Sequence, residues 1–135
     1  MNRRISSLVL TVTMVAALAV LAAACSNNSL APFQPEITNA TDNFQLQATG
    51  VGNVSTTLTY SWSNTGTRAT VNHSTTTAAG TTLLVIRDAA GATVYSRALS
   101  ASLNEATTAG TAGTWTIQLT LSGYSGSLNF RAQRL

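Results

Sequence analysis

The sequence predicts an all-β protein: a single antiparallel β-sandwich of about seven strands that follows an N-terminal signal peptide and a flexible tether. Apolar and polar residues alternate with a period of two in run after run beyond Asp42, which is typical of half-buried strands. Turn signals separate these runs at intervals of roughly 8–14 residues, which favours an immunoglobulin-like or jelly-roll sandwich over a closed barrel. The same region shows no amphipathic helical pattern.

The composition limits the chain to one domain with a nearly uncharged surface. The sequence has 135 residues, of which 8% are charged, against roughly 25% in average soluble proteins. Residues 25–135 contain five arginines, four acidic residues and no lysine. This balance argues against a nucleic-acid binder, a coiled coil and a charged disordered tail.

Residues 1–24 have the layout of a secretory signal peptide. Arg3 and Arg4 precede an apolar run from Leu8 to Ala24, as in a basic n-region followed by an apolar h-region. The run is also close to the shortest helix that spans a bilayer, so an uncleaved anchor helix is the alternative. The residue that follows the run, Cys25, favours cleavage.

Cys25 is the only cysteine of the chain and follows Leu21-Ala22-Ala23-Ala24. This segment resembles the lipobox of bacterial lipoproteins. The resemblance implies cleavage before Cys25, lipidation of its thiol with acyl chains such as palmitate, and a membrane as the partner of the mature N-terminus. It places the protein in the cell envelope. Ser26 implies the outer membrane, on its periplasmic or surface face, if the cell has two membranes.

The remaining chain divides into a tether, residues 25–41, and a folded domain, residues 42–135. Pro32 and Pro35 interrupt a polar segment, which argues against regular structure there. Alternation in the domain predicts seven strands. In order, these are residues 44–48, 57–63, 69–74, 82–86, 93–99, 114–121 and 127–133.

Four segments carry the turn signals: residues 49–53, 64–66, 88–91 and 122–126. In the third, Asp88 suits the start of a type I turn and Gly91 the left-handed position that follows. Counting outward from this turn pairs Ile86 with Val94. It also places Tyr95 and Arg97 on the outer face of the strand, with Tyr95 the most exposed aromatic residue of the hairpin.

Several phrases of the domain resemble small, uncharacterised secreted or lipid-anchored bacterial β-sandwich proteins. The resemblance covers residues 44–133 and implies a sandwich, but it carries no activity and no site. The phrases are Tyr-Ser-Trp-Ser-Asn-Thr-Gly-Thr at 60–67, Ile-Arg-Asp-Ala-Ala-Gly at 86–91, Gly-Thr-Trp-Thr-Ile at 113–117 and Ser-Gly-Ser-Leu-Asn-Phe-Arg at 125–131.

The residues that could support catalysis or metal binding all have plainer interpretations. His73, the only histidine, would need an aspartate and a serine for a catalytic triad, but it reads as a strand-end residue beside a polar loop. A glycosidase pair could draw only on four acids. Of these, Glu36 falls in the tether, Asp42 opens a strand, Asp88 starts a turn, and Glu105 falls in a Thr/Gly-rich loop. We therefore predict no catalytic residue, no metal site and no cofactor.

Two classes of function remain. The first is a non-enzymatic, lipid-anchored envelope protein with a structural, adhesive or accessory domain. The second is a module that binds a glycan or another envelope polymer, for which Trp62, Trp115 and Tyr124 are the candidate contacts. Both tryptophans share a strand face with apolar neighbours, so core packing is the preferred interpretation, and Tyr124 is expected to fold back from its turn. Arg131 and Arg134 read as solvated side chains.

Overall fold

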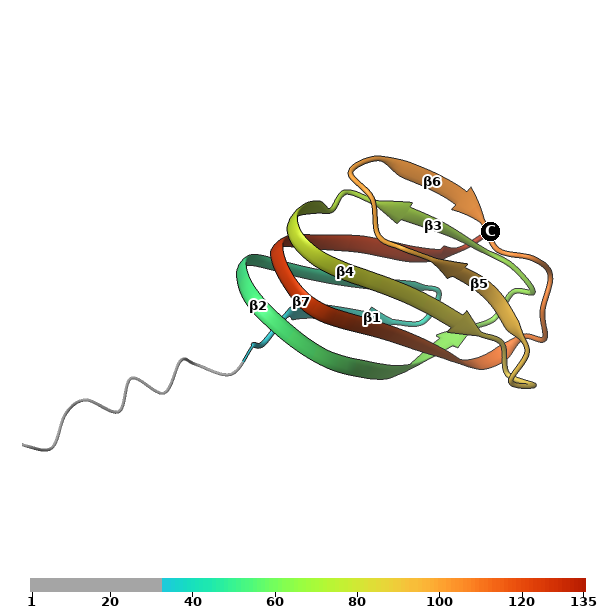
Figure 1. Ribbon diagram of the computed structural model, residues 1–135. Helices are drawn as coiled ribbons and strands as arrows, with labels where there is room; N and C mark the ends of the chain where they lie inside the picture. Colours follow the sequence, from blue (N-terminus) through green and yellow to red (C-terminus); the bar gives the residue numbers. More distant parts are fainter. Residues whose placement is uncertain (1–32) are drawn as a thin grey trace, which may run out of the picture. The chain divides into compact units, whose positions relative to one another are not determined.

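The computed structural model describes residues 33–135, which form one antiparallel sheet of seven strands (Figure 1). The all-β prediction is therefore confirmed. The predicted signal peptide and Cys25 lie outside the described residues. The strands are β1 (Glu36–Ala40), β2 (Asn43–Asn64), β3 (Ala69–His73), β4 (Thr76–Arg87), β5 (Thr93–Arg97), β6 (Leu103–Ala106) and β7 (Gly113–Arg134).

The two longest strands, β2 and β7, pair with each other along both halves. The first half of β2 runs beside the second half of β7, and the second half of β2 runs beside the first half of β7. Both strands curl strongly midway (Figure 1). The second half of β7 also pairs with β3, and β3 with β6, whereas its first half pairs with β4, and β4 with β5. The single sheet thus bends over on itself and encloses a core.

The bends coincide with two of the predicted turns, so the prediction of separate strands there is wrong. Residues 44–48 and 57–63 belong to one strand, and so do residues 114–121 and 127–133. Register shifts interrupt the β2–β7 ladder between Ala48 and Thr56. Positive φ angles at Gly50 and Gly126 accompany these bends, and a Cβ at Gly126 would collide with the carbonyl oxygen of Thr76. Extra residues in β2 between Ala48 and Val54, and in β7 between Leu121 and Tyr124, form β-bulges, which bend a strand without ending it.

Two short strands, β1 and β6, were not predicted from the alternation of apolar and polar residues. Residues Glu36–Ala40 form β1, although the prolines before them suggested a tether as far as residue 41. Glu105 lies in β6 and not in a loop. Both strands lie at sheet edges, where neither face needs a full apolar stripe and the alternation is correspondingly weak.

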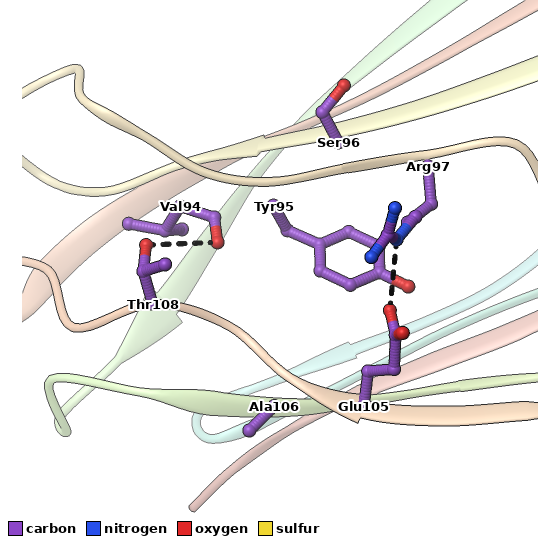
Figure 2. A pocket seen from close by; sticks show the side chains of 7 residues that line it. All are labelled: Val94, Tyr95, Ser96, Arg97, Glu105, Ala106 and Thr108. Carbon is purple, nitrogen blue, oxygen red and sulfur yellow. Dashed lines mark hydrogen bonds and ion pairs between the residues drawn. The ribbon is translucent and has the colours of Figure 1, made fainter.

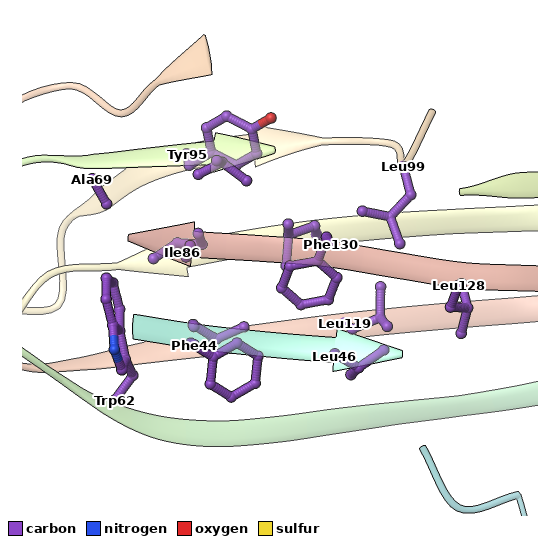
Figure 3. Packing of buried hydrophobic residues seen from close by; sticks show 14 of the residues in the cluster. Phe44, Leu46, Trp62, Ala69, Ile86, Tyr95, Leu99, Leu119, Leu128 and Phe130 are labelled. Carbon is purple, nitrogen blue, oxygen red and sulfur yellow. The ribbon is translucent and has the colours of Figure 1, made fainter. Parts of the chain in front are cut away.

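The core contains the inward residues that the alternation predicted (Figure 3). Trp62 pairs with Trp115 across β2 and β7, and their rings meet edge to face at a centroid distance of 5.8 Å. Both side chains are fully buried. Leu58 and Tyr60 are partly buried beside the core. Four further residues on the inward face of β7 are also buried: Ile117, Leu119, Leu128 and Phe130.

The turn at Asp88 forms as predicted, but the register beyond it differs. The Gly91 N–H donates to the Asp88 carbonyl at 3.0 Å, and Gly91 has a φ of 85°. Ile86, however, faces Tyr95 and not Val94, because a bulge places one extra residue in β5. A one-residue slip turns the following side chains to the other face. Tyr95 is consequently buried, at 7% exposure, and Arg97 shares its face.

The Trp62–Trp115 contact predicts a large loss of stability in Trp115→Ala. Truncating a buried tryptophan typically costs about 3–5 kcal/mol of unfolding free energy, a large part of the total for a domain of this size. Chemical denaturation of Trp115→Ala should show this loss. The neighbouring exposed variant Thr114→Ala should unfold within about 0.5 kcal/mol of the parent. A Trp115→Ala protein as stable as Thr114→Ala would contradict the packing described.

Candidate functional site

Polar side chains from three strands meet at the seam between β5 and β6, and this seam is the candidate site. His73 ends β3, Tyr95 and Arg97 belong to β5, and Glu105 belongs to β6. Strands β5 and β6 are the terminal strands at opposite ends of the hydrogen-bonded series β5-β4-β7-β3-β6. Bending of the sheet brings them together, so that their side chains face each other across a cleft (Figure 2).

His73 lies at the bottom of the seam with only 2% of its surface exposed. The backbone N–H of Ser100 donates to its Nδ1 at 3.3 Å, and its Nε2 lies 3.0 Å from the hydroxyl of Tyr95. Because an N–H can only donate, Nδ1 is the acceptor and the proton of the neutral ring is on Nε2. Burial lowers the pKa of His73, an effect that the carboxylate of Glu105 partly opposes. The neutral imidazole is therefore the form that the seam holds.

Tyr95 carries the contact from β3 to β5. Burial is the main cause that raises the pKa of its hydroxyl to about 12, and the nearby carboxylate of Glu105 adds to this. The phenol is therefore protonated at any physiological pH. Its ring packs edge to face on His73, at a centroid distance of 5.9 Å, so the pair joins two strands through both a hydrogen bond and a ring contact.

An ion pair and a backbone contact bridge β5 to the β6 side of the seam. Arg97 Nε lies 3.1 Å from Glu105 Oε2, and these side chains are 59% and 33% exposed. Exposure at this level leaves the pair screened by water, so it adds little stability. Further along, the Thr108 N–H donates to the Val94 carbonyl at 3.0 Å. Between these bridges lies an open cleft of about 550 Å³.

The side chains of the seam link β5 to β3 and to β6. One of them, the imidazole of His73, can bind a proton. The hydroxyl of Tyr95 and both ring nitrogens of His73 bind each other or the backbone, and Arg97 and Glu105 neutralise each other. Within residues 33–135, no group of three or more His, Cys, Asp or Glu side chains is arranged to hold a metal ion. The arrangement is suited to joining two sheet edges.

The two aspartates that a triad would need serve loops elsewhere. Asp88 is buried, and its carboxylate accepts backbone N–H bonds from Ala90, Ala92 and Thr111 at 2.8–3.0 Å. These bonds, that of Thr111 first, lower the pKa of Asp88. The ring of His73 has Tyr95 and Ser100 as its partners instead.

Asp42 braces the loop after β2 in a similar way. Its carboxylate accepts bonds from the backbone N–H and the hydroxyl of Thr65 at 2.7–3.0 Å, and the N–H bond is the main cause that lowers its pKa. Arg134 lies 3.3 Å from the same carboxylate. Arg131 is exposed and donates to Gln45 Oε1 at 3.0 Å, so Arg131 and Arg134 both make surface contacts.

The aromatic side chains that a glycan-binding module would use are all buried. The indole N–H of Trp62 donates to the Ala40 carbonyl at 3.1 Å, and that of Trp115 to the Thr111 carbonyl at 2.8 Å. Tyr124 is fully buried, and its hydroxyl lies 3.0 Å from the Ser127 carbonyl oxygen. The expectations of core packing for the tryptophans and of an inward-folded Tyr124 are confirmed.

Sequence reasoning placed Tyr95 and Arg97 on one face but chose the wrong face, and it missed Glu105 as a strand residue. The acid at Glu105 and the base at Arg97 are only eight residues apart, which is the one signal that could have suggested a contact. The alternation of apolar and polar residues gives no sign of the bulge at Val94. Because the bulge decides which face Tyr95 and Arg97 occupy, the sequence alone could not predict the seam.

No protein-family model, curated protein or solved structure matches this chain. Within the described part of the chain, no helix is long and apolar enough to cross a membrane.

The burial of neutral His73 predicts a pH-dependent stability. Between the lowered pKa of folded His73 and the unfolded value of 6.5, the unfolded chain binds a proton that the folded chain does not. Stability should therefore fall as the pH drops below about 6.5, by at most about 1.4 kcal/mol per pH unit. His73→Gln keeps a side-chain N–H donor without titrating in this range.

Denaturation midpoints measured between pH 7.5 and pH 5 test this expectation. The parent chain should lose stability over this range, and His73→Gln should lose clearly less. Both chains keep Asp42 and Asp88, whose lowered pKa values produce losses only at more acidic pH and equally in the two. Equal slopes in the parent and in His73→Gln would show that His73 is not held neutral by the fold.

Proposed function

We propose that this chain is a non-enzymatic, lipid-anchored cell-envelope protein with a structural, adhesive or accessory β-sandwich domain. The observation that carries the proposal is the burial of both tryptophans. Each is 0% exposed and hydrogen-bonds a backbone carbonyl through its indole. These side chains stabilise the fold and offer no face to a ligand.

The alternative, a glycan-binding module, gains less support. Such modules stack sugars on exposed aromatic faces, and the three aromatic residues best placed by the sequence, Trp62, Trp115 and Tyr124, have none exposed. Tyr95 lines the cleft at the seam, but its hydroxyl is bound to His73. An envelope protein or a glycan would therefore contact the polar surface of the sheet and not an aromatic platform.

The use of the acidic groups also supports a structural role. Asp42 and Asp88 each hold a loop through several hydrogen bonds, and Glu105 bridges two strands. A catalytic carboxylate needs a free oxygen directed at a substrate. Carboxylates committed to backbone donors suit a domain whose task is to keep its shape.

The lipid anchor rests on the sequence around Cys25. Two or three acyl chains hold a protein stably at a membrane, whereas one does not, so a lipidated Cys25 would keep the domain at the envelope. The following Ser26 favours the outer membrane in a cell with two membranes. The near balance of arginines and acids beyond the leader gives no basic surface for nucleic acid.

Intact-mass spectrometry of the protein made in bacteria tests the anchor. The parent should begin at residue 25 and carry the mass of acyl chains, because the lipobox directs both steps. Cys25→Ser should keep residues 1–24 and carry no lipid, while the neighbouring control Ser26→Ala should be processed like the parent. An unprocessed, unmodified parent chain would contradict lipid anchoring and favour an uncleaved anchor helix.

A further inference from the structure

The second half of β2 has a long backbone edge with no strand partner among residues 33–135. Thr56–Asn64 pairs with β7 in unbroken register. On the other side, β1 accompanies only the first half of β2, as far as Gln47. The sheet therefore ends at this stretch of β2, and one set of its backbone groups is directed out of the sheet.

The positions of two carbonyls identify which groups these are. Asn39 Nδ2 donates to the Ser61 carbonyl, and the Asp42 N–H donates to the Ser63 carbonyl, both at 2.8 Å. Both carbonyls thus point away from β7. Because backbone direction alternates along a strand, Thr57 and Thr59 also direct their N–H and C=O groups outward, and no described residue hydrogen-bonds them.

This edge lacks the features that protect the other edges. Charged side chains and prolines at an edge discourage pairing with another chain. The short edge strands each carry a charge, namely Glu36 in β1, Arg97 in β5 and Glu105 in β6, whereas β2 contains neither a charged residue nor a proline. The first half of β4 is also uncharged, but two register shifts break its pairing.

We propose that this edge pairs with the same edge of a second copy, antiparallel, about a two-fold axis at Leu58. A two-fold contact brings identical surfaces together, and an uncharged strand can face itself without repulsion between like charges. A continuous sheet then runs through both copies. The proposal does not depend on the lipid anchor.

The position of the axis follows from the limits of the free edge. The Ser61 and Ser63 carbonyls are already occupied, and register shifts end the regular ladder on the other side, before Thr56. The free window is Thr56–Tyr60, and its centre is Leu58. In this register, Thr57 of one copy faces Thr59 of the other, and each such pair exchanges two N–H···O bonds.

The two copies of Leu58 then meet as a close, non-hydrogen-bonded pair, with Cα atoms about 4.5 Å apart. Leu58 is only partly buried in the single chain, so pairing covers apolar surface that is otherwise in water. An interface of only five residues from each copy falls in the weak, transient class. Self-association is therefore expected only at high protein concentration.

Cysteine cross-linking tests the register directly. The full chain with Cys25→Ser, kept in detergent, leaves the introduced thiol as the only one. Under mild oxidation, Leu58→Cys should form a disulfide-linked dimer, because its Cα separation suits a disulfide. Thr59→Cys, equally close to the edge, should not, because copies of residue 59 lie more than about 7 Å apart in this register. Cross-linking of Thr59→Cys as efficient as that of Leu58→Cys, or of neither variant, would overturn the proposal.

Sedimentation equilibrium supplies a readout that does not require a change at Leu58. Thr59→Lys places a charge at the edge and should weaken self-association at least about tenfold. Gln118→Lys is the matched control, since Gln118 pairs with Thr59 on the same face but one strand further in, and it should associate like the parent. A parent chain that stays monomeric up to about 1 mM, or equal effects of the two lysines, would overturn the proposal.

Discussion

The pairing of β2 with β7 along both of their halves is the constraint on which the rest of the structure depends. Each strand passes through a bulged bend near its middle and continues into the opposite part of the sheet. The two halves of the β2–β7 ladder, one before and one after the bend, therefore face each other across the core. The core, with Trp62 against Trp115 at one end and Phe44 against Phe130, forms between them, and β3 and β4 simply extend what this pair begins.

Bending one sheet over on itself also determines where its edges lie. It brings β5 and β6 together at the seam, where Tyr95 reaches His73 and Arg97 reaches Glu105. Side chains bridge this gap, and burial lowers the pKa of one of them, His73, so we predict that the fold loses stability at acidic pH. At the far side, the outer edge of the second half of β2 has no strand partner among the described residues, and its lack of charge suits it to a partner with the same surface.

The sequence could predict which residues face inward, because alternation reports burial along each strand. It could not predict that the glycine-containing segments 49–53 and 122–126 are bends and not turns, since both use glycine for the same positive φ. Because Val94 is an extra residue in β5, Tyr95 lies on the face opposite to the predicted one. The contacts of Tyr95 at the seam therefore could not be predicted. The prediction for Cys25 depends on local pattern alone and concerns residues before the described part of the chain.

Backbone NOE measurements on the domain in solution test most directly whether β2 and β7 each continue through the bend. The account predicts cross-strand contacts of β2 with β7 on both sides of it: Thr59 with Gln118 beyond the bend, and Leu46 with Phe130 before it. Contacts of Leu46 with a strand other than β1 or β7 would contradict the account. They would show separate strands joined by turns, as in an ordinary two-sheet sandwich.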